Sequence, residues 1–433
     1  MKHLKLQLAG LTLALAACGI ENAVLAPPPN IYSTGTNYPT NSVPVVLRTV
    51  TPRIFYVTDR APEKTGTGGL TYGSERSEAM AFGAAQVRFG ASDWPDLVAR
   101  THVDGRRNLS DLSVESVEEI VRFRAVPLAT SRTEGELIFD PAEKADYDSR
   151  GVAFQEAIRK EIARTGNRRI LVFTHGVRND FDRSITSLAN IWHYVGRGSI
   201  PVAFAWPAGN GGPLGYFRDR EAGDFSVFHA KEFLRLLAEM PEVEDIDIVA
   251  HSRGTDVMAK ALRELVIYHR GRGKPPKTSM KTGTLILAAA DLDTGVVRQR
   301  LQAERFSEAF EQINIYINPA DAALRLSSIL TNVPRLGSAT SDVLSPENIQ
   351  RLGKSELVHF IRVENISGRG HSYFRSNPAV LSDIVLALRT RAFPGGTLRP
   401  LERGDDGFWQ LHPNYPLERL PDLVDTFISG SER

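Results

Sequence analysis

The pattern of apolar and polar positions changes at about residue 151. From there to about residue 391, short apolar runs alternate with amphipathic stretches of helical spacing. Several runs are almost continuously apolar, as in strands that are covered on both faces. The predicted strands are 169–174, 201–206, 246–250, 284–290, 313–317 and 357–363, and the predicted helices are 152–165, 181–194, 222–239, 255–269 and 377–391. This order predicts an α/β fold with a mostly parallel sheet and helices on both faces.

Three shorter runs before residue 151 also look like strands, and the second and third of them alternate between apolar and polar residues. They are 53–60, 85–90 and 121–126, and we expect them to pair at one edge of the sheet. The glycine-rich segment between about 61 and 77 is expected to be mobile.

A sharp turn joins the strand at 246–250 to the helix at 255–269. Its residues are Ala250-His251-Ser252-Arg253-Gly254, with small residues at both ends. This strand–turn–helix context is that of a nucleophile elbow, which lifts a serine hydroxyl clear of the sheet edge. The usual pattern has Gly where Ala250 stands, and Ser252 could instead be the N-cap of the following helix. The five residues alone do not decide between these two interpretations.

A His-Gly turn follows the strand at 169–174. In proteins with a nucleophile elbow, a turn at this place carries one half of the oxyanion hole. His175-Gly176 would let the amide of Val177 face the substrate, and the amide of Arg253 would be the second donor. The alternative is an ordinary β–α turn in which the glycine only relieves backbone strain.

A nucleophilic serine needs a base, which follows it along the chain in this kind of site. Four histidines follow Ser252. His371 lies in a glycine-flanked loop after the last core strand, from which it can reach over the strand ends. His269 ends a polar helical stretch, His359 lies inside a strand and His412 lies in a proline-rich tail. We therefore favour His371 as the base.

The acid that orients the base has three candidates. Asp321 follows the penultimate core strand, whereas Asp291 and Asp293 follow the strand before it. We favour Asp321, although it could instead cap a helix at 322–330. One of the other two aspartates is then expected to shape the floor of the pocket.

Further residues at these strand ends are candidates for the wall of a substrate pocket. They are His175, Gly176, Trp206, Tyr216, His251, Asp291 and Asp293. A glycine-rich loop after Trp206 could form a mobile lip, and a purely structural loop is the alternative.

The N-terminus has the features of a bacterial lipoprotein signal. Lys2 and Lys5 precede an apolar run at 6–17 that is too short to span a membrane comfortably. Cys18 follows at the lipidation position and is the only cysteine in the chain. Lipidation would leave no free thiol in an oxidising compartment. Cleavage after Ala26, giving a secreted or periplasmic protein, is the alternative.

These signals divide the chain into four parts. We expect a signal segment over 1–18, a flexible tether over 19–50, one α/β domain over 51–394, and a wrapping tail over 395–433 with Trp409 and Phe427 as docking points. The mature protein would be held in the bacterial cell envelope by a lipid on Cys18, facing the periplasm or the exterior. A formal net charge of +1 with mixed signs argues against nucleic acid as a partner. No metal-ligand spacing of His and Cys is visible, so we expect neither metal nor organic cofactor.

Several motifs together resemble the bacterial α/β-hydrolase family of uncharacterised esterase/lipase-like lipoproteins. The motifs are Phe173-Thr174-His175-Gly176, Phe204-Ala205-Trp206-Pro207, Gly215-Tyr216 with Asp219, Ala250-His251-Ser252-Arg253-Gly254, Ala289-Ala290-Asp291-Leu292-Asp293, His371-Ser372-Tyr373-Phe374 and, in the opening strand, 55–60. The resemblance implies an α/β-hydrolase fold with Ser252 as nucleophile, His371 as base and an aspartate as the third member. It does not supply a substrate.

The leading hypothesis is a serine hydrolase, carboxylesterase- or lipase-like, that cleaves an ester or thioester of a small molecule or lipid through an acyl-Ser252 intermediate. One alternative is a lipid-anchored envelope or binding protein that keeps the fold without catalysis. Another is an acyltransferase that passes the acyl group to an acceptor other than water.

Overall fold

The structure is a computed structural model. It describes residues 23–33, 37–102, 111–212, 214–340, 356–364 and 370–421, together with residues 343, 344, 347, 349 and 423. The predicted signal segment with Cys18 lies outside the described residues, and so does Phe427 in the tail.

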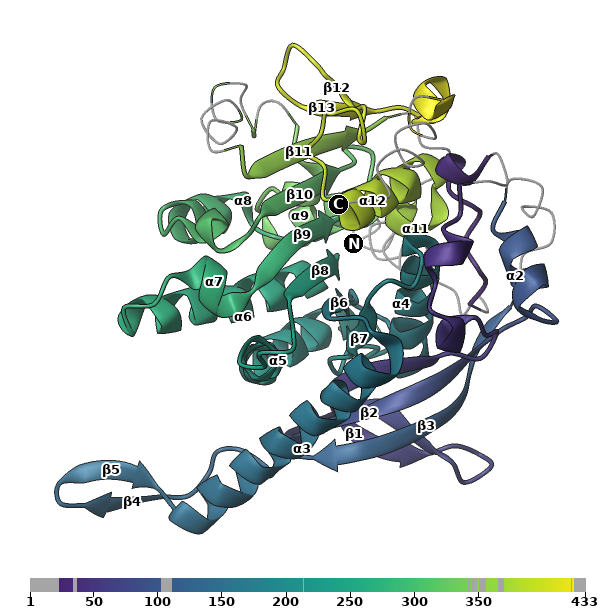
Figure 1. Ribbon diagram of the computed structural model, residues 1–433. Coiled ribbons are helices and arrows are strands. Elements are labelled where there is room, and N and C mark those ends of the chain that lie inside the picture. Colours follow the sequence, from purple (N-terminus) through teal and green to yellow (C-terminus); the bar gives the residue numbers. More distant parts are fainter. Residues whose placement is uncertain are drawn as a thin grey trace, which may run out of the picture.

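One mixed sheet runs through the middle of the molecule (Figure 1). Among the described residues its eleven strands lie in the order β12-β13-β11-β10-β9-β8-β6-β7-β1-β2-β3. Their bounds are β1 (Arg53–Lys64), β2 (Leu70–Phe89), β3 (Leu112–Arg122), β6 (Arg169–Thr174), β7 (Ile200–Phe204), β8 (Asp245–His251), β9 (Thr282–Ala288), β10 (Gln312–Ile317), β11 (Val358–Val363), β12 (Glu402–Arg403) and β13 (Trp409–Leu411). All neighbours from β1 to β13 pair in parallel, whereas β2, β3 and β12 pair antiparallel at the two edges. The predicted fold, with N-terminal strands at one sheet edge, is confirmed.

Helices cover both faces of this sheet, as Figure 1 shows. Their bounds are α2 (Trp94–Arg100), α3 (Pro141–Thr165), α4 (Phe181–Val195), α5 (Gly215–Ala238), α6 (Gly254–Gly271), α7 (Pro276–Met280), α8 (Thr294–Val296), α9 (Ala322–Thr331), α11 (Tyr373–Ser376) and α12 (Pro378–Thr390). One apolar layer joins the sheet to α3, α5 and α6, and a second joins it to α4 and α12.

Alternation along the strands feeds both layers. In β6, Ile170 and Val172 pack into the first layer, whereas Leu171 and Phe173 pack into the second. Successive side chains of a strand point to opposite faces, so a strand that is buried on both faces must be apolar throughout. Each fully buried side chain of this kind contributes about 1.5–3 kcal/mol relative to exposure.

The expected flexible tether is wrong for its described residues. Ile31, Tyr32 and Leu47 are buried, and all three pack into the apolar layer that contains α4 and α12. The carbonyl of Leu47 accepts a hydrogen bond from Arg197 Nη1 at 2.6 Å. Isolated apolar residues in a proline-rich segment show no periodicity, so the pattern could not reveal that they dock.

The segment after β1 is also more regular than expected. β2 begins at Leu70 and pairs with β1 across a short turn, so most of the glycine-rich stretch lies in a hairpin. The third edge strand is β3, which ends at Arg122, so the expectation of a strand at 121–126 was placed too late.

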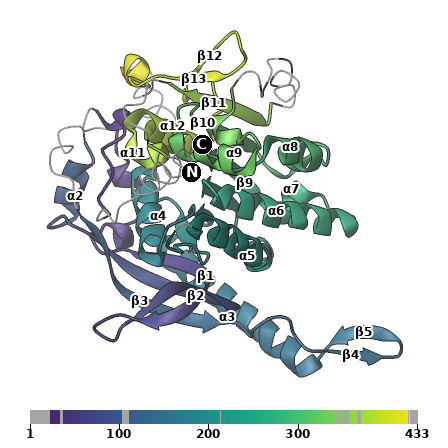
Figure 2. The same cartoon turned by 180° about the vertical axis from the view of Figure 1, so that it is seen from behind.

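A second hairpin was not predicted. β4 (Thr130–Thr133) and β5 (Glu136–Phe139) stand away from the sheet at the beginning of α3, as both Figure 1 and Figure 2 show. Positive φ at Glu134 and Gly135 makes the tight turn between them. α3 itself begins at Pro141, capped by the Asp140 side chain, eleven residues before the predicted start.

The tail does more than wrap the domain. β13 adds to the sheet in parallel beside β11, with Trp409 opposite Ile361. Arg399, fully buried, forms an ion pair with the equally buried Asp383 at 2.7 Å. The tail is therefore part of the sheet and core.

No described helix is long and apolar enough to cross a membrane.

Candidate active site

The turn after β8 has the geometry of a nucleophile elbow. Ser252 follows directly on the strand and has φ of 53°, in the left-handed region. A non-glycine residue there costs on the order of 1 kcal/mol and is held only where its surroundings fix it. Its amide donates to the carbonyl of Ala288 on the neighbouring strand at 3.0 Å.

Two glycines are needed around this serine because the backbones pass so closely. A β-carbon on Gly254 would lie 2.3 Å from the carbonyl oxygen of His175. A β-carbon on Gly176 would lie 2.6 Å from Cβ of Ser252. The two loops after β6 and β8 are thus pressed together at the serine.

Ser252, His371 and Asp321 form one hydrogen-bonded chain. Ser252 Oγ lies 2.6 Å from His371 Nε2, and His371 Nδ1 lies 2.7 Å from Asp321 Oδ2. The Asp321 side chain is fully buried, whereas that of His371 keeps 17% of its surface exposed. A hydroxyl bonded to an imidazole that a buried carboxylate orients can transfer its proton as it attacks an electrophile.

The two alternatives for Ser252 and Asp321 end differently. The side chain of Ser252 does not cap α6, because its hydroxyl bonds His371 and the N-cap residue is Arg253, which makes no side-chain cap bond. Asp321 fills both of its expected roles. Its Oδ1 accepts the amides at the start of α9, while Oδ2 faces His371.

The rival aspartates, Asp291 and Asp293, have other partners. Asp291 accepts a hydrogen bond from the Tyr216 hydroxyl at 2.9 Å and forms a buried ion pair with Arg335. Burial raises the pKa of that tyrosine. Asp293 caps the short helix α8. Asp291 lies directly behind the nucleophile, since its amide is 3.3 Å from the Ser252 carbonyl oxygen.

The other three histidines that follow the elbow lie in other parts of the fold. His269 lies near the end of α6, and His359 is buried in β11. His412 is exposed and lies 3.5 Å from a carboxylate oxygen of Glu364.

Two side chains anchor the segment that carries His371, and neither role was predicted. His251 Nε2 donates to the backbone carbonyl of His371 at 3.0 Å, and its ring stacks on Phe374 with 4.4 Å between centroids. Burial, reinforced by the nearby His371, holds the pKa of His251 well below its usual value, so the ring is neutral. The Tyr373 hydroxyl donates to the carbonyl of Tyr316 at 2.9 Å, which ties the segment to β10.

In the loop after β6, Val177 follows Gly176, the residue that lies against Ser252. The carbonyl of Gly176 accepts hydrogen bonds from His175 Nδ1 at 2.9 Å and from Asn179 Nδ2 at 3.1 Å. Carbonyl and N–H of a trans peptide point in opposite directions, so these donors turn the Val177 N–H the other way. Among the described residues, the Val177 amide has no protein acceptor.

The second candidate donor is the amide of Arg253, at the start of α6. Its side chain is buried and forms an ion pair with Asp256 at 2.9 Å. Its Nη1 also lies 3.5 Å from the carbonyl of Asp291. The guanidinium is therefore engaged within the protein, while the amide stands at the positive end of a helix.

His175 and Trp206 lie beneath the loop as a buried pair. Their rings stack with 5.1 Å between centroids, and Trp206 Nε1 donates to the His175 carbonyl at 2.8 Å. Burial and the nearby Arg60 lower the pKa of His175 to about 3. Both residues support the site from the core side.

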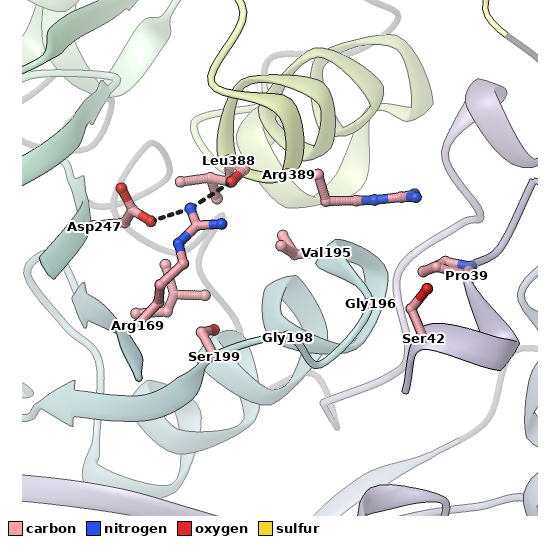
Figure 3. Close-up of a pocket in the computed structure, with 11 residues that line it drawn as sticks. Pro39, Ser42, Arg169, Val195, Gly196, Gly198, Ser199, Asp247, Leu388 and Arg389 are labelled. Atoms are coloured by element: carbon pink, nitrogen blue, oxygen red, sulfur yellow. Dashed lines mark hydrogen bonds and ion pairs between the residues drawn. The ribbon is translucent and has the colours of Figure 1, made fainter. Parts of the chain in front are cut away.

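A separate cavity of about 210 Å³ lies at the other end of the strands (Figure 3). Its lining includes Arg169 at the start of β6 and Asp247 near the start of β8, joined by a hydrogen bond of 2.7 Å. Ser252 and Gly176 follow the ends of these same strands.

Within the described part of the chain, no three His, Cys, Asp or Glu side chains gather as a metal site.

The comparison with protein families agrees with this architecture. Residues 150–389 match the family model described as "Alpha/beta hydrolase of unknown function (DUF900)". No curated protein matches the chain. Among solved structures, an esterase from Pyrobaculum calidifontis is similar at 11% identity, over 53% of this chain and 78% of that one, with a TM-score of 0.28. This last likeness is too low to carry an argument.

Proposed function

The chain belongs to the DUF900 family of α/β-hydrolases, and from that premise we propose that it is a serine hydrolase acting on carboxylic esters or thioesters. One observation carries the proposal: Ser252, at the elbow, is hydrogen-bonded to His371, which is hydrogen-bonded to the buried Asp321. The proposal extends to a substrate that is a small-molecule or lipid ester.

The reaction would proceed in two halves. Ser252 Oγ attacks the carbonyl carbon while His371 Nε2 takes its proton, and Asp321 stabilises the imidazolium that forms. The tetrahedral intermediate collapses, the alcohol or thiol leaves with the proton from His371, and an acyl-Ser252 remains. A water molecule, deprotonated by the same imidazole, then releases the acid and regenerates the serine.

The carbonyl oxygen gains negative charge in both halves. The amides of Val177 and Arg253 are the donors we assign to it. Each such donor contributes about 10²–10³ to the rate, which corresponds to roughly 3–4 kcal/mol of transition-state stabilisation.

Labelling with a fluorophosphonate probe tests the nucleophile. We expect the folded protein to react at Ser252 and the Ser252→Ala variant to stay unlabelled. Ser149→Ala, on the exposed face of α3, is the matched control and should label like the wild type. Equal labelling of wild type and Ser252→Ala, or none in a folded wild type, would remove the proposal.

We also propose that a lipid on Cys18 holds the mature protein at a membrane of the bacterial cell envelope. The motif at the end of the N-terminal apolar run supports this placement. A fatty-acid analogue fed to expressing cells should tag the wild type and fail to tag Cys18→Ala. Equal tagging of both would refute the anchor.

A further inference from the structure

Two loops meet beside the candidate oxyanion hole. One follows β6 and carries Val177, and the other follows β7 and contains Gly209. A β-carbon on Gly209 would lie 3.3 Å from the carbonyl oxygen of Asn179, so the loops are in contact. Arg178, next to Val177, has φ of 60°, a left-handed conformation that needs support from its surroundings.

Asp219 supplies part of that support. It lies in the first turns of α5 and is fully buried. Its Oδ2 accepts the amides of Arg178 at 2.8 Å and Gly209 at 3.3 Å. Its Oδ1 accepts the amide and the side-chain nitrogen of Asn210 at 3.1 and 2.9 Å. One carboxylate thus binds four N–H donors from both loops, and hydrogen bonds to a charged acceptor are the strong ones.

Arg60 binds the same two loops through their carbonyls. It extends from β1, next to β7 in the sheet, and is 1% exposed. Its Nη2 donates to the carbonyl of Asn179 at 2.7 Å, and its Nη1 donates to that of Ala208 at 2.9 Å. Each accepting carbonyl is one residue from an amide that Asp219 binds.

The two peptide planes that flank Val177 are fixed as a result. Asn179 Nδ2 bonds the carbonyls of both Gly176 and Val177. Asp219 bonds the amide of Arg178, on the opposite side of the second plane. Arg60 in turn holds Asn179. The framework of Arg60, Asn179 and Asp219 therefore sets the direction of the Val177 N–H.

Charge is balanced within it. Burial lowers the pKa of Arg60 to about 10, and neighbouring carboxylates, including Asp219, oppose that shift, so the guanidinium stays charged at neutral pH. A lone buried carboxylate near a developing oxyanion would oppose it. With the Arg60 cation nearby and four N–H donors bonded to it, the carboxylate can orient the loop at less electrostatic cost.

We propose that Asp219 and Arg60 are positioning residues that hold the oxyanion-binding amide of Val177 toward Ser252. This inference rests on the proposed serine hydrolase function. It assigns the pair an effect on the transition state, beyond a contribution to folding. Neither residue touches the substrate.

The test compares an ester with the matching thionoester, whose carbonyl oxygen is replaced by sulfur. Sulfur is a larger and weaker hydrogen-bond acceptor, so the thionoester gains less from the oxyanion hole. We expect Asp219→Asn to lower kcat for the ester by about tenfold to a hundredfold, with a smaller loss for the thionoester and little change in KM. The ester-to-thionoester ratio of kcat/KM should therefore fall. Asp224→Asn, an exposed change on the same helix, is the control and should leave the ratio unchanged.

Arg60→Lys and Asn179→Ala provide the same measurement through other members of the framework. Both should lower the ratio, and they decide the matter if Asp219→Asn does not fold. An unchanged ratio in the folded variants, with both substrates slowed equally, would overturn the positioning role. A folded wild type that hydrolyses neither substrate would instead count against the proposed function itself.

Discussion

Asp321 divides its two carboxylate oxygens between a helix and a histidine. Oδ1 accepts the amides of Ala323 and Leu324 at 3.0 and 3.1 Å, and Oδ2 lies 2.7 Å from His371 Nδ1. The competing predictions of an acid and a helix cap therefore describe the same residue. A cap that is also part of a site is fixed in place by the backbone it caps.

Asp321→Asn separates these two tasks. Asparagine caps a helix about as well as aspartate, so the free energy of unfolding should change by less than about 1 kcal/mol. With its one oxygen capping the helix, the asparagine turns its NH2 group toward Nδ1 and cannot accept the hydrogen bond from Nδ1–H, so kcat for an ester should fall by about 10³–10⁴. Asp321→Ala should lose both the activity and about 1 kcal/mol of stability.

Denaturant unfolding and initial-rate kinetics on the two variants measure these effects. A large loss of stability in Asp321→Asn, or an activity close to that of the wild type, would contradict this division of roles.

At the scale of elements, the site is assembled from loops that follow parallel strands. β6, β8 and β10 lead into Gly176, Ser252 and Asp321, and the segment after β11 carries His371. Parallel strands bring these ends to one edge of the sheet, although the residues are far apart in sequence. The order of strands alone was enough to predict this meeting.

Tyr373 connects three of these elements and tests how the base is held. Its hydroxyl accepts a hydrogen bond from the Ala289 amide at 3.0 Å and donates one to the Tyr316 carbonyl. Tyr373→Phe leaves that buried amide without its acceptor, which should cost about 1–3 kcal/mol of unfolding free energy. Because the residue is two positions from His371, kcat should also fall, with KM little changed. A variant as stable and as active as the wild type would show that the other contacts suffice.

Local signals explain which elements could be predicted. The core strands are apolar because both faces are covered, and the helices between them end where expected to within a few residues. The β4–β5 hairpin could not be predicted, since all of its residues are exposed and no burial pattern marks it. The early start of α3 had a readable signal in Asp140-Pro141, a capping residue followed by a proline at the first helical position.

The catalytic residues could be predicted because their order along the chain is fixed by the kind of site. The residues that position the loops could not, because their contacts form only in the folded chain. Ser252, His371 and Asp321 were favoured from their places after successive strands, and the structure brings them into one chain. Asp219 and Arg60 were not assigned these roles because their partners are backbone groups of distant loops. No pattern of side chains in a sequence indicates that a carboxylate will bind main-chain amides.

For the whole molecule, buried neutral histidines make stability depend on pH. His359 is 7% exposed, and burial, with the charge of Arg399 second, lowers its pKa to about 3. In the unfolded chain the same group binds a proton below about pH 6.5. The native state does not bind that proton above about pH 3. The free energy of unfolding therefore falls as the pH drops from 6.5 toward 3, by roughly 1 kcal/mol per pH unit for one such group.

His359→Phe should remove this contribution. Its unfolding free energy should decline less steeply between pH 6.5 and 4.5 than that of the wild type, by about 1 kcal/mol per unit. Denaturant titrations at several pH values give the slope. His412→Gln, at an exposed histidine, is the control and should keep the wild-type slope. The same slope in His359→Phe as in the wild type would contradict the assignment.

Trapping the acyl group shows most directly whether Ser252 is the nucleophile. The protein is mixed rapidly with an activated ester such as p-nitrophenyl acetate, quenched in acid within one turnover, and analysed by peptide mass spectrometry. We expect an acetyl group on the peptide that contains Ser252, decaying as acetate appears and absent from Ser252→Ala. Hydrolysis that proceeds at the same rate in Ser252→Ala, with the acyl group on another residue or on none, would contradict it.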